Sequence, residues 1–523
     1  YHKGLYLREP EYKPIVRAKA ISFENQGQPG WEVLDHLGNT VLYRNPEAEA
    51  VLSRIGYEKD QLLILKNAAE GDRPVGFVSF RELRSEELFG VLKSMELANA
   101  VRRRTSREVL YITGIHARER EIHDGEAIRD PAQLLLAEVI TQALEKNCSF
   151  AIFAAERGTV SKEAAFALER QGFVRPELLE EGEKRVIYMV DMHEPLMLLH
   201  NLETTLKEPF GSSPAVLSAI ERNHKKLQTA MTKLYPGNLV LSLSSGVMHH
   251  RMVDRITALN GVPGEPLTPR RLGENMCVPF GKILRGKVVP NTVTKTLHTD
   301  KVYEPELDSY AIEAFPYYSP LESQIKTIRS FDRPVILVDD LVHKADRLQA
   351  LAPSLKKAGI PVKKVVVGVI SGYGRDLMET FHLPVESIYS MPNLRQWFVE
   401  STLYPFIGGD TVRRRDMKVA GLQPSVNMIL PYAAPRLSGC SREALYEFSV
   451  CCIENSRDLL QVLEAEYRSQ FARNLTLSRL SEAVILPLCP DKGSCMEYDE
   501  NLAASVYLEN DLEMLGRMKK FMV

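Results

Sequence analysis

The chain has 523 residues, and its 66 Lys and Arg nearly balance its 68 Asp and Glu. A formal net charge of −2 gives no electrostatic basis for binding nucleic acid or an anionic membrane. No apolar run approaches the ~18 residues of a membrane span, and the seven cysteines form neither a disulfide framework nor a CxxC zinc motif. We therefore expect a cytoplasmic protein of two to four domains, roughly, that binds neither nucleic acid nor membrane.

Residues 1–60 are predicted to form an N-terminal extension of short strands and turns. After it, residues 61–206 alternate apolar strands with amphipathic helices. The predicted strands are 62–65, 75–80, 109–115, 150–155 and 186–190, and the predicted helices are 131–146 and 161–171. Asp130 and Ser161 stand where helix N-caps are expected, which fixes the starts of both helices.

This order of elements, with a helix that begins at Ser161 and ends before Gly172-Phe173, resembles the GNAT family of N-acyltransferases. The resemblance implies an α+β domain that uses acetyl-CoA, held by Ile115, Ala117, Arg118 and Ser161. The connection over residues 117–130 carries five acids against three arginines, which is unfavourable beside a diphosphate. A GNAT-like module that binds no CoA is therefore the alternative.

A helical bridge is expected over residues 193–236, with helices at 196–206 and 214–234 and a linker around 207–213. The strand 238–243 then opens into Ser244-Ser245-Gly246, and a helix follows from about residue 249 to 259. Backbone N–H groups in such a turn before a helix are suited to a phosphate.

The apolar run Val335–Val338 leads directly into Asp339 and Asp340. A continuous apolar run predicts a strand buried on both faces, as in a parallel sheet. A helix at 347–358 and a second strand at 362–370 complete a strand–helix–strand crossover. Because ligands bind at the carboxyl ends of parallel strands, the two acids are candidates for holding a ribose diol or Mg²⁺. The alternative is a solvated acidic strand end.

This motif resembles the PRPP-binding motif of type I phosphoribosyltransferases, although the following loop lacks the family's usual Gly and Thr. The resemblance implies a parallel-sheet, Rossmann-type domain that uses PRPP and Mg²⁺. It also implies a mobile loop that closes over the ligand, which we expect in the long, poorly periodic stretch 281–306. It assigns catalysis to Asp339, Asp340 and Lys295, and the metal to the same two acids. PRPP would be bound by Ser244, Ser245, Gly246, His343, Lys344 and Arg347, and the base by Tyr373, Tyr389 and Trp397.

The fold class expected is α/β, with four segments: an extension (1–60), a GNAT-like domain (61–206), a phosphoribosyltransferase-like domain (207–436) and a helical C-terminal region (437–523). The preferred function is a phosphoribosyltransferase-like enzyme acting on a small phosphoribosyl or nucleotide ligand. A homodimer is a possible assembly of this enzyme. The alternatives are a PRPP- or nucleotide-sensing regulator and a CoA-dependent N-acyltransferase. Residues 1–10 resemble the end of nicotinate-nucleotide adenylyltransferase-like proteins, which implies a further nucleotidyltransferase domain before residue 1.

Overall fold

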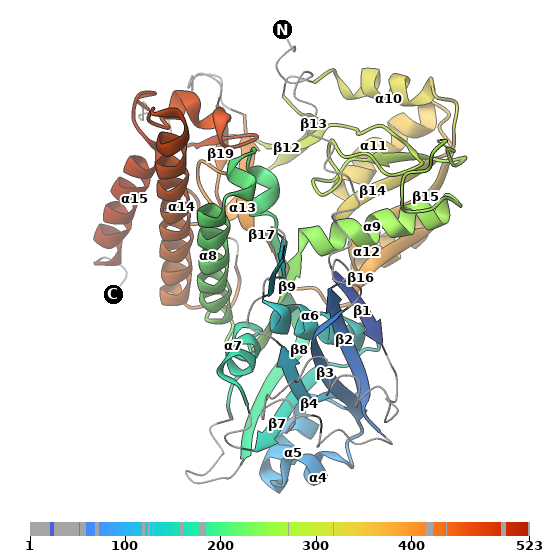
Figure 1. Ribbon diagram of the computed structural model, residues 1–523, viewed down its shortest axis with the longest axis vertical. Helices are drawn as coiled ribbons and strands as arrows, with labels where there is room; N and C mark the ends of the chain where they lie inside the picture. The colour runs from blue at the N-terminus through green and yellow to red at the C-terminus, as the bar shows by residue number, and fades with distance from the viewer. Residues whose placement is uncertain are drawn as a thin grey trace. The chain divides into compact units, whose positions relative to one another are not determined.

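The computed structural model shows two compact units (Figure 1). Unit 1 comprises Tyr1–Leu196, Gly237–His298 and Tyr317–Gln396, and unit 2 comprises Met197–Pro236, Thr299–Pro316 and Trp397–Val523. The described residues are 21–25, 52, 59–67, 73–117, 121–123, 126–128, 130–156, 160–176, 185–269, 271–316, 318–413, 422–435, 437–492 and 498–520. Residues 1–10, most of the extension to residue 60, and Arg118 lie outside them. The four contiguous segments expected from the sequence stay a prediction.

A large mixed sheet dominates the first part of unit 1, in the order β1-β2-β3-β4-β7-β8, with β9 paired to β8. Its strands are β1 (Ile21–Asn25), β2 (Gln61–Asn67), β3 (Arg73–Leu83), β4 (Val109–Ala117), β7 (Phe150–Glu156), β8 (Arg185–His200) and β9 (Asn238–Ser244). From β1 to β8, neighbours are antiparallel except β4 and β7, which run parallel. A short hairpin, β5 (Glu121–His123) with β6 (Glu126–Ile128), stands apart from this sheet.

Four helices accompany this sheet: α4 (Leu88–Leu92), α5 (Met95–Arg104), α6 (Pro131–Glu145) and α7 (Lys162–Arg170). Leu88 and Leu97 join Ile152 in one buried apolar cluster, so α4 and α5 cover one part of the sheet. The predicted caps are present: the side chain of Asp130 accepts from the N–H of Gln133, and Ser161 accepts from Ala164. Local sequence signals thus set both helix starts correctly.

The second part of unit 1 is a fully parallel sheet in the order β11-β10-β14-β15-β16. Its strands are β10 (Met276–Pro279), β11 (Val293–Thr294), β14 (Val335–Val342), β15 (Val362–Ser371) and β16 (Val385–Met391). Its helices are α9 (Ser245–Leu259), α10 (Leu321–Arg329), α11 (Asp346–Lys357) and α12 (Gly372–Thr380). The predicted crossover from β14 through α11 to β15 is present, and Pro353 lies inside α11 without ending it.

The two faces of the parallel sheet are covered by different helices. Leu348 of α11, Ile325 of α10 and Met378 of α12 share one buried cluster with Leu337, so these three helices cover one face. Helix α9 packs against β15 on the other, where the Met248 sulfur approaches so closely that a Cβ at Gly368 would overlap it. A Cβ at Gly368 would also approach the backbone oxygen of Asp340, so this position favours glycine.

Strand β9 is not part of the parallel sheet. The sequence predicts it as that sheet's first core strand, but β9 pairs with β8 of the mixed sheet. Its last residue, Ser244, is the N-cap of α9, which begins at Ser245 with no intervening loop. An apolar strand satisfies its backbone equally well at either sheet, so the periodicity of residues 238–243 did not decide between them.

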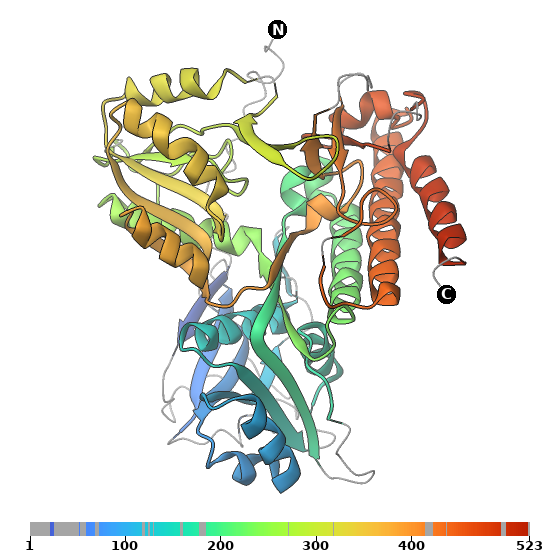
Figure 2. The ribbon, with the colours of Figure 1, turned by 180° about the vertical axis from the view of Figure 1, so that it is seen from behind.

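Unit 2 combines a five-stranded sheet with long helices. The sheet order is β13-β12-β18-β19-β20, from β12 (Thr299–Tyr303), β13 (Tyr310–Ala314), β18 (Asp410–Val412), β19 (Gln423–Val426) and β20 (Leu488–Pro490). The helices are α8 (Pro214–Thr232), α13 (Glu400–Leu403), α14 (Arg442–Phe471) and α15 (Ala504–Lys519), and β17 (Gln396–Val399) precedes α13. Helix α14 packs against both α8 and α15, and the three lie side by side in both views (Figure 2).

Two further differences from the predicted elements concern the helical bridge expected over residues 193–236 and the segment 281–306 after β10. Residues 196–206 are not an α-helix: β8 continues to His200 and a 3-10 helix follows at Leu202–Thr205. Residues 281–306 hold β11 and β12 where a long irregular loop was expected. Among the described residues, no helix combines the length and the apolar character that crossing a bilayer requires.

Candidate functional site

The predicted acids lie in the inner strand of the parallel sheet. β14 pairs with β10 on one side and β15 on the other, so the expected buried strand is confirmed. The register continues past Asp339 to Leu341 and Val342. Because successive residues of a strand point to opposite faces, Asp339 and Asp340 face opposite sides of the sheet. The structure therefore does not bring the two carboxylates onto one ligand.

Asp339 is buried, with 5% of its surface exposed. Its Oδ1 accepts from the Nη1 of Arg347 at 3.0 Å and from the N–H of Asp340 at 2.9 Å. Burial raises the pKa of Asp339 to about 6, although the positive charge of Arg347 opposes this. Arg347 thus compensates a buried carboxylate, and its expected binding of the 5′-phosphate stays a prediction.

Asp340 holds the turn that follows β10. Its Oδ2 accepts from the N–H of Lys282 at 2.6 Å, and its Oδ1 accepts from the N–H of Ile283 at 2.9 Å. The approach is so close that a Cβ at Gly281 would overlap the carboxylate. A Mg²⁺ bound directly by Asp340 would have to displace these donors, so the geometry disfavours the predicted metal ligation, which stays a prediction.

A partly buried lysine that sequence reasoning missed lies beside Asp340. Burial lowers the pKa of Lys287, and the charge of Asp340 opposes this. Lys287 also interacts electrostatically with His249 and His250 of α9, whose Nδ1 atoms are 3.4 Å apart. Burial lowers the pKa of His249 to about 3, so this ring is neutral near pH 7. Lys287 stands in a basic stretch, but only its neighbours in space distinguish it from other lysines.

The residues expected to bind phosphate do not gather at one point. Ser244 caps α9 by accepting from the N–H of Val247, and Ser245 and Gly246 are part of the first turn of that helix. His343 lies with its Nδ1 2.8 Å from the Ser371 hydroxyl. Lys344 is exposed.

The other predicted residues lie as follows. Tyr389 is 5% exposed beneath the guanidinium of Arg251, whereas Tyr373 is 55% exposed, and Trp397 belongs to unit 2. Lys295 donates its backbone N–H to the Cys277 carbonyl and so extends the pairing along β10. Their roles in base binding and catalysis stay predictions.

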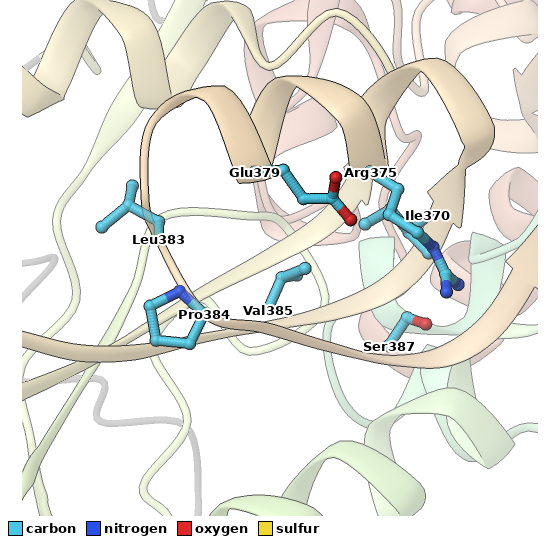
Figure 3. A pocket seen from close by; sticks show the side chains of 7 residues that line it. All are labelled: Ile370, Arg375, Glu379, Leu383, Pro384, Val385 and Ser387. Atoms are coloured by element: carbon cyan, nitrogen blue, oxygen red, sulfur yellow. The ribbon is translucent and has the colours of Figure 1, made fainter.

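One pocket of the parallel sheet lies at α12 and β16, away from the two acids (Figure 3). Arg375 and Glu379 of α12 project over the strand that carries Val385 and Ser387. Its lining residues are Ile370, Arg375, Glu379, Leu383, Pro384, Val385 and Ser387. No residue that the sequence singled out lines it.

In the mixed sheet, β4 and β7 part before either strand ends. Their parallel pairing covers Leu110 to Ile112, opposite Ala151 to Phe153, and no later pair is recorded. Yet β4 stays paired to β3 as far as Ala117, and β7 stays paired to β8 as far as Glu156. Among the residues that the structure describes, the β4–β7 ladder therefore does not extend past Ile112, and Ile115 and Ala117 lie in the part of β4 beyond it.

The strand edge beyond Ile112 and the N-terminus of α6 offer different backbone environments to a ligand. Backbone N–H and C=O groups of a strand edge are suited to the amides of an extended ligand arm. The N-terminus of α6, where a diphosphate would be favoured, already holds the carboxylate of Asp130. That carboxylate also pairs with Arg170 at 2.5 Å. Ser161 uses its hydroxyl to cap α7.

No protein-family model matches the chain, and no curated protein matches it. Solved structures similar to about a third of it are acetyltransferases and related acyltransferases. NAA60 of Arabidopsis thaliana in complex with acetyl-CoA is 14% identical, over 32% of this chain and 96% of that one, with a TM-score of 0.22. A putative GNAT-family acetyltransferase of Desulfovibrio desulfuricans is 15% identical, over 33% of this chain and 99% of that one, with a TM-score of 0.22. FeeM, an N-acyl amino acid synthase from uncultured soil microbes, is also 15% identical, over 33% of this chain and 91% of that one, with a TM-score of 0.22.

Proposed function

We propose that the mixed sheet of unit 1 forms a CoA-dependent N-acyltransferase module. The observation that carries this proposal is the parting of β4 and β7 after Ile112 and Phe153. Where two parallel strands separate before their ends, the backbone of the separated segment can pair with an extended ligand. The GNAT resemblance of the helix at Ser161 agrees with this reading.

The chain's own residues have three roles in this proposal. The N–H groups of β4 between Thr113 and Ala117 would hold the amides of the pantetheine arm, and the one nearest the reacting carbonyl would polarise its oxygen. Asp130 at the start of α6, together with its partner Arg170 at the end of α7, would adjust the charge met by the diphosphate. When bound, acetyl-CoA would supply an acyl group as a thioester, so that an amine exchanges the C–S bond for a C–N bond.

Calorimetric titration of the full chain with acetyl-CoA tests binding, and release of free CoA thiol with a panel of amines tests turnover. The panel holds a peptide with a free N-terminus, a polyamine and an amino acid. We expect saturable binding and an amine-dependent release of thiol. Absence of both binding and release at high protein concentration would contradict the proposal.

Asp130→Asn sharpens the test, because asparagine keeps the helix cap but removes the charge at the α6 N-terminus. If the diphosphate lies there, the variant binds CoA several-fold more tightly than the wild type. Asp60→Asn is the matched control, since Asp60 also pairs with an arginine, Arg81, but lies outside the β4–α6 connection. Equal gains in both variants would argue against this position for the diphosphate.

A second candidate function is a phosphosugar site at the carboxyl end of β14. It is favoured by one observation: Lys287 interacts electrostatically with Asp340 and with His249 and His250 of α9. PRPP binding, with and without Mg²⁺, tests it. We expect Lys287→Met and Asp340→Asn to weaken binding, whereas Lys344→Met, on the exposed loop, should not; equal losses would contradict the assignment.

A further inference from the structure

Three potential metal ligands meet in unit 2, far from each other in the sequence. His200 is the last residue of β8, His224 lies on α8, and Glu400 is the first residue of α13. Glu400 is 200 residues from His200 and 176 from His224. No spacing motif connects them, so only the folded chain makes them neighbours.

The side chain of Asn201 fixes the end of β8 on the start of α13. Its Oδ1 accepts from the N–H of Ser401 at 3.0 Å, and its Nδ2 donates to the Ser401 hydroxyl at 2.8 Å. Asn201 follows His200 and Ser401 follows Glu400, so this paired contact sets the distance between the two potential ligands. Such fixing of ligand positions is what a preformed metal site needs.

The distances within the cluster match a tetrahedral site. Oε2 of Glu400 is 3.1 Å from Nδ1 of His200 and 3.3 Å from Nδ1 of His224, and the ligand atoms all lie within 4.8 Å of one another. A zinc ion with bonds of ~2.0–2.1 Å to nitrogen and oxygen keeps its tetrahedral ligands roughly 3.3 Å apart. The ring centroids of His200 and His224 are 2.8 Å apart, so the two imidazoles must move apart for a single cation to contact all three residues.

Glu400 is fully buried, and a buried carboxylate must be compensated by positive charge or hydrogen bonds. The Tyr404 hydroxyl donates to Oε1 at 3.1 Å and itself accepts from Nδ2 of Asn455 at 3.0 Å. Tyr404 thus holds one carboxylate oxygen and leaves the other to face the two imidazoles.

We propose that His200, His224 and Glu400 bind one divalent transition-metal ion of the zinc class. Two imidazole nitrogens with one carboxylate oxygen suit zinc better than Mg²⁺ or Ca²⁺, which prefer oxygen ligands only. The side chains of His200 and His224 remain 22% and 12% exposed, so water reaches the imidazole side of the cluster. Three protein ligands and a water-accessible fourth position are typical of a catalytic zinc site.

The competing arrangement holds the same atoms with protons alone, through two Nδ1–H···Oε2 hydrogen bonds. A calorimetric titration with zinc separates the metal site from this hydrogen-bonded arrangement. The sample is the untagged full chain, from which a chelator has first removed any bound metal. We expect one zinc ion per chain. His200→Ala and His224→Ala should each weaken zinc binding about 100-fold or more, and His193→Ala should leave it unchanged, because His193 pairs with Asp191 outside the cluster.

Tyr404→Phe keeps the test decisive if a histidine variant does not fold. It preserves the shape of the side chain and removes the hydroxyl that orients Glu400, so zinc affinity should fall about tenfold. The wild type can also be loaded with Co²⁺, and the loss of Co²⁺ absorption when Zn²⁺ displaces it gives a readout that needs no variant. No zinc uptake by the wild type, or equal affinity in the wild type and both histidine variants, would overturn the proposal. Neither result bears on CoA binding.

Discussion

Asp339 in unit 1 and Glu400 in unit 2 are both carboxylates removed from water, and their pKa values move in opposite directions. For Asp339, burial dominates and raises the pKa to about 6 despite one arginine partner. For Glu400, burial also acts to raise the pKa, but the charges and hydrogen bonds of His224 and His200 outweigh it and lower the value to about 2. The comparison shows that burial alone does not set the charge of a buried acid; the number and direction of its partners do.

Removing one imidazole from Glu400 should have the largest effect. His224→Ala leaves the buried carboxylate with one ring and one hydroxyl, and breaking a buried pair in this way costs about 3–5 kcal/mol of unfolding free energy. Hydrogen exchange in α8 and α14 would register the loss locally. His193→Ala, at a partly exposed pair, should cost under about 1 kcal/mol. A loss no larger than that control would mean that Glu400 is compensated in another way.

The pH dependence of stability should have opposite signs at the two acids, measured with chelator present. The raised pKa of Asp339 means that its folded form holds a proton more readily, so stability falls as pH rises from about 4 to 6. The lowered pKa of Glu400 means that stability is lost as pH falls from about 4.5 toward 2. Each contribution is at most about 3 kcal/mol. Asp339→Asn and Glu400→Gln should each flatten only their own part of the profile.

Arg347→Met tests the single partner of Asp339. The loss at pH 7 should be about 1–3 kcal/mol, smaller than at Glu400, because Asp339 is already close to accepting a proton. Urea unfolding at pH 7 and pH 5 should show the cost shrinking at the lower pH. Arg329→Met removes an exposed pair with Asp332 and is the control. A cost that does not change with pH would count against this account of Asp339.

Gly368→Ala tests the packing beneath Asp340. A Cβ there would overlap the Met248 sulfur and approach the Asp340 carbonyl oxygen, so we expect a loss of about 1–3 kcal/mol and weaker exchange protection in α9. Gly90→Ala, in α4 with open space around it, should be neutral or stabilising by up to about 1 kcal/mol. Equal effects at the two glycines would contradict the close approach.

Tyr373→Ala should have the smallest effect. The ring is 55% exposed, and substitutions at such positions change stability by no more than about 0.5 kcal/mol. Thermal unfolding would check this. A large loss would show that the ring near His343 supports the end of β15 in the folded protein.

The local signals in the sequence were reliable where one element decided the outcome. The run Val335–Val338 predicted an inner strand, and Asp130 and Ser161 predicted helix starts, because strand burial and helix capping depend on neighbouring residues. The same signals did not place β9, since its apolar residues fit either sheet. They also could not show that β14 continues through Asp339 and Asp340 and points them to opposite faces, so a shared site at the two acids stays a prediction.

The sequence by itself determined the elements of this protein: their periodicity, their caps and the parallel crossover around β14 all follow from interactions within a few residues. Only the tertiary structure decided which groups meet. Three features depend on the packing of separate elements: the parting of β4 from β7, the electrostatic interaction of Lys287 with Asp340, and the cluster of His200, His224 and Glu400. Burial then sets the charge of those groups, and burial is a property of the folded chain.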